Sequence, residues 1–159
     1  MYYIGIDPGT TGAAAILDGE GALVRVFDLP TYEVKVSSKV RRVLDPPITK
    51  RLLDPYQENA VFIVEKVASR PMQAVQSIFS LGDTFGVLRA ISEIMSPDVF
   101  YITPQKWKKY YQLGSAKDKS LEIARDLYPD APLTRKKDHN RAEALLLAHY
   151  GYLNNLGDD

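Results

Sequence analysis

The chain has 159 residues, of which 45% are hydrophobic and 25% are charged, and its 20 basic and 20 acidic residues give a formal net charge of zero. A chain of this length can bury one core, so we expect a single domain over residues 1–159. The absence of cysteine excludes disulfides and thiolate metal sites. No apolar run reaches the length of a membrane span, and we expect a cytoplasmic protein that does not associate with membranes.

The first part of the chain predicts three consecutive antiparallel strands. Tyr2–Asp7 and Gly12–Leu17 are apolar runs joined by a tight turn, and Ala22–Leu29 follows a second glycine turn. Residues 30–59 are polar and contain prolines. Here we predict only a short helix at Ile48–Leu53, and we expect Thr31–Arg42 to be mobile.

The next part alternates strands with a long helix. Val61–Val67 is a run of β-branched and aromatic residues typical of a central strand that is buried on both faces. Gln73–Glu93 has apolar residues at helical spacing, with Gly82 and Gly86 placed where the helix could approach the sheet closely. Asp98–Ile102 predicts a fifth strand.

Three further helices are expected at Pro104–Tyr111, Lys117–Leu127 and Arg141–Leu153. No repeat and no linker rich in glycine or serine divides the chain. This order of elements predicts an α/β protein with a five-stranded mixed sheet, three antiparallel strands followed by two parallel ones, flanked by helices.

Two acidic residues stand at the ends of predicted buried strands. Asp7 precedes a glycine turn, where it could act as a metal ligand or as a turn residue that caps residues 9–12. Glu65 interrupts an apolar strand and could bind a metal or form a salt bridge with a basic neighbour.

A third acid, Glu143, lies at the start of an otherwise apolar helix. His139 and Asn140 precede it by four and three residues and could share its face, whereas Asp138 could reach a site only from the loop. The structural alternative makes Asn140 the helix N-cap and Glu143 its capping-box partner.

Three acids at the ends of apolar elements indicate a site for divalent cations, because converging carboxylates repel one another unless cations neutralise them. Two such ions can activate water for hydrolysis of a phosphodiester. Residues 100–141 carry ten basic and five acidic residues, either as solvated helix faces or as a phosphate-binding surface. The predicted phosphate contacts are Lys106, Lys108, Lys109, Lys117, Lys119, Arg135, Lys136, Lys137 and Arg141. Among the nearby aromatics, Trp107, Tyr110 and Tyr111, we favour a core role over base stacking.

Four segments in order along the chain, Ile4–Gly12, Val64–Val67, Ser80–Val87 and Arg141–Ala148, carry a shared pattern. Together they resemble the RuvC family of Holliday junction resolvases, in its phage-type or organellar-type branch. The resemblance implies an RNase H-like fold and a homodimer that cuts four-way or other branched DNA. It also implies two Mg²⁺ ions per active site, with Mn²⁺ as an alternative, and allows an organellar or viral DNA-processing compartment.

The family's catalytic, metal-binding carboxylates correspond to Asp7, Glu65 and Glu143. Its fourth ligand falls on Asn140, a poor substitute, so we expect Asp138 or His139 to take this role. Ala68 stands where bacterial members carry an aromatic near the junction centre. We therefore consider Met72 as the side chain that could act as a junction wedge.

The sequence also allows three rival functions. ATP-binding proteins of the actin, Hsp70 and sugar-kinase group open with a similar glycine-containing hairpin. An RNA-processing nuclease of the same fold is a nearer competitor. A junction-binding module without catalysis is the third, and it predicts that the acidic residues are dispensable.

Overall fold

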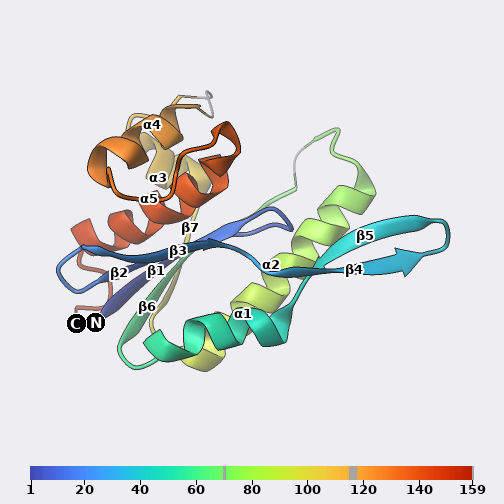
Figure 1. Ribbon diagram of the computed structural model, residues 1–159, viewed down its shortest axis with the longest axis horizontal. Coiled ribbons are helices and arrows are strands. Elements are labelled where there is room, and N and C mark those ends of the chain that lie inside the picture. The colour runs from blue at the N-terminus through green and yellow to red at the C-terminus, as the bar shows by residue number, and fades with distance from the viewer. Residues whose placement is uncertain (70, 115–117, 159) are drawn as a thin grey trace.

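The protein is a five-stranded mixed sheet with helices on both faces, as a computed structural model shows (Figure 1). The structure describes residues 1–69, 71–114 and 118–158. In chain order the elements are β1 (Tyr2–Asp7), β2 (Ala13–Asp18), β3 (Leu23–Asp28), β4 (Thr31–Val36), β5 (Lys39–Leu44), α1 (Pro46–Leu53), the 3₁₀ turn η1 (Asp54–Tyr56), β6 (Ala60–Glu65), α2 (Val75–Met95), β7 (Val99–Ile102), α3 (Pro104–Tyr110), α4 (Asp118–Leu127), the 3₁₀ turn η2 (Lys136–Asp138) and α5 (His139–Leu153).

The strand order is β3-β2-β1-β6-β7. Strands β1, β2 and β3 pair antiparallel, whereas β6 runs parallel to β1 and β7 runs parallel to β6. The predicted fold class is therefore confirmed. Within the part of the chain that the structure describes, no helix combines the length and hydrophobicity needed to cross a bilayer.

Two apolar cores lie on opposite faces of the sheet because side chains alternate along each strand. Tyr3, Val61 and Ile63 pack with α5 in one core, and Ile4 and Phe62 pack with residues of α1 and α2 in the other. The central strands β1 and β6 are therefore buried on both faces, as their apolar sequences predict.

Helix α5 packs directly against β1 at Gly5. A Cβ atom on Gly5 would overlap with the carbonyl oxygen of Ala144 and the amide nitrogen of Ala148, so only glycine permits this approach. The contact fixes which part of α5 lies over the end of β1, and this position determines the geometry of the candidate site.

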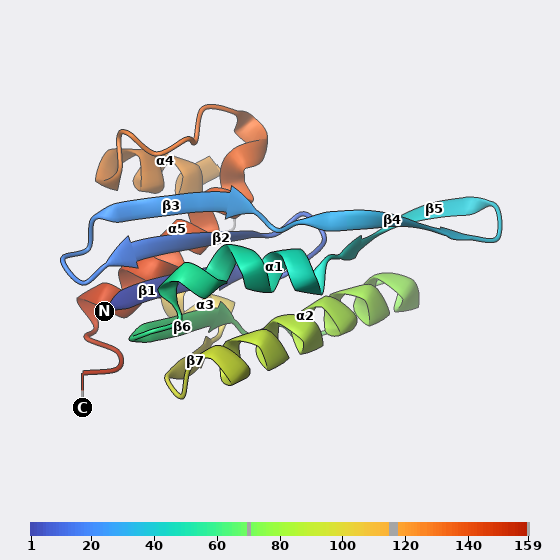
Figure 2. The ribbon, with the colours of Figure 1, turned by 60° about the horizontal axis from the view of Figure 1, so that its bottom comes forward.

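Two expectations about surface segments are wrong. Thr31–Arg42, where no strand was predicted, lies within the antiparallel ribbon β4–β5, which projects from the body of the protein (Figure 2). Gly82 and Gly86 do not bring α2 close to the sheet, because a Cβ atom at either position would meet nothing within 4 Å. Both glycines face away from the core.

Candidate active site

Asp7 and Glu65 end two neighbouring parallel strands. In the register of β1 and β6, Ile6 is opposite Val64, so the next residue of each strand reaches the same edge of the sheet. Alternation along the strands directs both carboxylates to the face covered by α5, which also holds Tyr3. Asp7 is only 7% exposed, so its charge requires polar or cationic neighbours.

Glu143 approaches the same edge from α5. It directly precedes Ala144, whose backbone lies against Gly5 of β1. One turn earlier, the side-chain amide of Asn140 donates to the carbonyl oxygen and Oγ1 of Thr11, in the loop that follows Asp7. The structure thus brings the backbone positions of Asp7, Glu65 and Glu143 to one corner of the fold.

Helix α3 connects two of these acids. The indole Nε1 of the fully buried Trp107 donates to Oε2 of Glu65 at 2.7 Å, so this tryptophan belongs to the core as predicted. The neighbouring Lys108 places its Nζ 3.2 Å from Oε1 of Glu143, whose side chain is 13% exposed. The sequence predicts neither pairing, because each joins elements far apart in the chain and leaves no local sequence signal.

Asp138 is held by Arg135. Its carboxylate is 1% exposed and accepts hydrogen bonds from the backbone N, Nε and Nη2 of Arg135 at 2.7, 2.9 and 2.6 Å. Burial alone would raise the pKa of Asp138, but the side-chain and backbone hydrogen bonds from Arg135 outweigh it and hold the pKa below its usual range. This aspartate is therefore engaged in a local ion pair at the start of α5.

His139 begins α5 and is partly exposed. Its position four residues before Glu143 places both on one face of the helix. The capping-box alternative for Asn140 and Glu143 is wrong, because α5 begins before Asn140 and the two side chains bond to Thr11 and Lys108 instead. Of the two candidates for the fourth ligand, His139 is the one on the Glu143 face.

The predicted DNA contacts divide into residues that form ion pairs within the protein and residues that are exposed without such a pair described. Arg141 binds Asp28 through two bonds of 2.6 and 2.9 Å, and these hydrogen bonds hold the pKa of Asp28 below its usual range. Arg135 is similarly engaged with Asp138. Lys117 lies outside the described residues. Besides Arg135, the exposed residues of the set are Lys106, Lys109, Lys119, Lys136 and Lys137.

Within the described residues, no group of three or more acidic or histidine side chains is arranged as a formed metal cluster. The donor types nevertheless suit a hard cation, since Asp7, Glu65 and Glu143 supply only carboxylate oxygens. The ammonium group of Lys108 beside Glu143 shows that this corner attracts positive charge. The chemistry of the residues thus fits Mg²⁺ or Mn²⁺.

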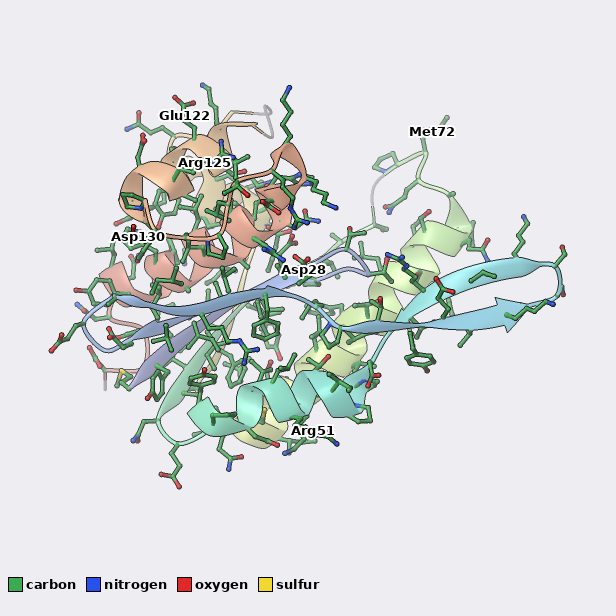
Figure 3. All side chains as sticks on the ribbon, viewed as in Figure 1. Asp28, Arg51, Met72, Glu122, Arg125 and Asp130 are labelled. Atoms are coloured by element: carbon green, nitrogen blue, oxygen red, sulfur yellow. The ribbon has the colours of Figure 1, made fainter. Side chains whose placement is uncertain are left out.

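A groove of about 680 Å³ leads from Glu65 toward Met72. Met72 is fully exposed, with a φ of 65°, in the turn before α2. Figure 3 shows its side chain at the tip of that turn, away from the sheet. The residue considered as a wedge therefore stands at the far end of a groove that begins at the acidic corner.

The structure resembles two solved structures of RuvC from Thermus thermophilus. One is RuvC in complex with a Holliday junction substrate, with a TM-score of 0.63 and 16% identity. The other, described as the RuvC structure, has a TM-score of 0.57 and 20% identity. Each match covers 99% of this chain and 97% of the RuvC chain. No family model matches the sequence, and no curated protein matches it.

These comparisons establish the class of fold. The chain has the RNase H-like fold of the RuvC structures over nearly its whole length. The resemblance drawn from the four sequence segments is therefore confirmed at the level of the fold.

Proposed function

We propose that this protein is a structure-selective endonuclease that cuts four-way or other branched DNA. The observation that carries the proposal is the meeting of Asp7, Glu65 and Glu143 at one corner of a RuvC fold. The solved structure with a Holliday junction shows that another protein of this fold binds such a substrate. The exposed lysines of α3, α4 and η2 supply positive charge on the side of the sheet that carries α5.

Asp7, Glu65 and Glu143 would hold divalent cations, and His139 would complete the set. Two bound Mg²⁺ ions would supply an activated water and stabilise the leaving oxygen of a phosphodiester. The protein's own contribution is to fix the carboxylates. Trp107 orients Glu65 by its 2.7 Å hydrogen bond, and Asn140 anchors the start of α5 to the loop after Asp7.

Lys108 has a second role in this proposal. Its Nζ pairs with Glu143 and also lies 5.1 Å from the centroid of the Trp107 ring. In the free protein the ammonium offsets the charge of the carboxylate. With DNA bound, it can turn to a phosphate oxygen next to the reacting one, because its side chain is 32% exposed.

A second copy of this chain is the proposed partner, since a junction requires one cut in each of two opposed strands. Helix α2 offers a stripe at helical spacing, which consists of the exposed Val75, Phe79 and Gly82 and the partly buried Gly86. Val75 and Phe79 are 83% and 76% exposed, and the glycines allow close approach of another helix. Val75→Glu should convert a dimer to a monomer in sedimentation velocity experiments, while Glu93→Gln should not.

The test of the proposed activity is cleavage of a synthetic four-way DNA junction in Mg²⁺ by wild type and Asp7→Asn. Loss of one group that stabilises charge in the transition state costs on the order of 10²–10³-fold in rate. We expect at least this loss with junction binding retained, because the exposed lysines are unchanged. Asp130→Asn, at an exposed acid, is the matched control. Unchanged cutting by Asp7→Asn would contradict the proposed site.

Two parallel assays separate the rival functions. Structured RNA in place of the junction tests an RNA-processing nuclease, and we expect branched DNA to be cut in preference. Equilibrium binding of ATP tests kinship with the actin and sugar-kinase group, and we expect none.

A further inference from the structure

The ribbon β4–β5 concentrates positive charge in a protein that has no net charge. Residues 31–44 have a net charge of +3, because they contain one acid, Glu33, and four basic residues, Lys35, Lys39, Arg41 and Arg42. The single ion pair described here, between Arg42 and Glu33, is 3.9 Å long with both side chains about two-thirds exposed. Such a pair is weak, so it leaves most of the positive charge available to a ligand.

Both faces of the ribbon are basic. In its register Val36 is opposite Lys39 and Glu33 is opposite Arg42, so Lys39 and Arg41 share one face while Lys35 and Arg42 share the other. The two strands pair chiefly with each other, and most of their side chains are exposed. The ribbon is therefore presented to solvent, and it contributes little to the core.

A groove connects this ribbon to the candidate active site. It has a volume of about 900 Å³ and lies between three elements: the loop after Asp7, strand β5 and the first half of α2. Pro8, Gln73 and Leu81 line both this groove and the one that leads from Glu65 to Met72. Figure 2 shows the ribbon and the start of α2 extending in the same direction beyond the sheet.

We propose that the β4–β5 ribbon is a binding arm for the phosphate backbone of duplex DNA. A duplex with one phosphate at the acidic corner would extend through the groove and along the ribbon. A two-stranded ribbon fits a DNA groove, and basic side chains on both of its faces can reach the two backbones that border the groove. The identity of that duplex as an arm of a junction rests on the proposed function, whereas binding to duplex DNA does not.

The test uses a triple variant, Lys39→Gln/Arg41→Gln/Arg42→Gln, and a linear DNA duplex without divalent metal. Each phosphate contact contributes about 0.9 to the slope of log K against log salt concentration. We expect the slope to fall by about 2–3 and the affinity near 0.1 M salt to fall at least about tenfold. The control, Arg25→Gln/Lys50→Gln/Arg51→Gln, removes the same charge from exposed residues that do not line the groove.

Cleavage of the four-way junction separates this proposal from the proposed function. If both hold, the triple variant requires more DNA for half-maximal cutting but keeps the wild-type rate at saturation. If wild type binds duplex through the ribbon but cuts no junction, the ribbon proposal stands and the proposed function fails. Circular dichroism of both variants checks that the fold is intact, as the exposure of the altered side chains predicts.

The position of bound DNA on the ribbon is tested by crosslinking. The chain has no cysteine, so Ser38→Cys places a single thiol for a photoreactive group at the ribbon tip. Glu58→Cys is the control. It lies in the exposed turn before β6, at the end of β6 that is opposite Glu65. We expect crosslinks to duplex DNA from position 38 only. The proposal is overturned if the ribbon triple variant keeps wild-type affinity and salt slope, or if both triple variants lose affinity equally. It is also overturned if the wild type binds no DNA, or if the ribbon binds a protein segment in place of DNA.

Discussion

The acidic corner and the β4–β5 ribbon are built in opposite ways. At the corner, the carboxylates sit on central strands and on α5, and a glycine contact, a tryptophan indole and a lysine hold their surroundings in place. In the ribbon, charged side chains stand on two exposed strands that pack mainly on each other. Chemistry requires the fixed geometry of the first region, whereas electrostatic binding tolerates the freedom of the second. Substitutions in the two regions should therefore separate cutting from binding.

The largest separation is expected from Glu143→Gln. This change removes one carboxylate charge from the corner and should lower the cutting rate on the order of 10²–10³-fold. Junction affinity should be unchanged or higher, because Lys108 is released from its pairing with Glu143. Glu122→Gln, at an exposed acid of α4, should leave both quantities at wild-type values. Single-turnover cleavage and equilibrium binding measure the two effects, and parallel losses in both would contradict the comparison.

Gly5→Ala tests the packing that places α5 over the corner. The added methyl group meets the backbone of Ala144 and Ala148, which cannot move without displacing the helix. We expect a loss of about 3 kcal/mol or more in the free energy of unfolding, at or above the upper end of overpacking effects. Urea denaturation measures it. Gly114→Ala is the control, because a Cβ atom there would also meet nothing within 4 Å, and it should not destabilise the protein.

Asp138→Asn tests whether Asp138 stabilises the fold or takes part in the acidic corner. The variant loses charge-assisted hydrogen bonds with Arg135, and we expect a cost of about 1–2 kcal/mol at pH 7 after allowing for solvent around that arginine. The pKa of Asp138 in the folded protein lies below 3.8, its unfolded value. The greater stability of the wild type is therefore present above pH 3.8 and is lost as the pH falls through the folded pKa. His139→Gln should instead reduce cutting with little change in stability. Urea unfolding at several pH values and junction cleavage distinguish the two residues, and the reverse pattern would make Asp138 the fourth ligand.

The smallest effect is expected in the ribbon turn. Ser37 has a φ of 56°, a left-handed conformation that glycine adopts without steric cost. Ser37→Gly should stabilise the ribbon locally by about 1 kcal/mol or less, seen as slower amide hydrogen exchange in β4 and β5. The global free energy of unfolding should not change, because the ribbon makes few contacts with the rest of the fold. A changed global value would show that the two regions are coupled.

The sequence predicts most of the corner and little of the ribbon, for physical reasons. Asp7 and Glu65 could be placed because each ends a buried strand, and parallel neighbours bring their ends to the same edge. The pairings made by Trp107 and Lys108 could not be predicted, because they depend on where α3 packs across the sheet. In β4 and β5 the β-branched residues are interspersed with charged ones, so the segment has the composition of a polar loop and no strand was predicted there.

We propose that the corner cuts branched DNA at two opposed strands. This proposal is tested most directly by a synthetic four-way junction labelled on each strand in turn, incubated with wild type and Mg²⁺, and read at nucleotide resolution. The predicted result is a pair of nicks in opposed strands, with a linear duplex of the same sequence left intact. An uncut junction, or linear duplex cut as readily as the junction, would contradict it.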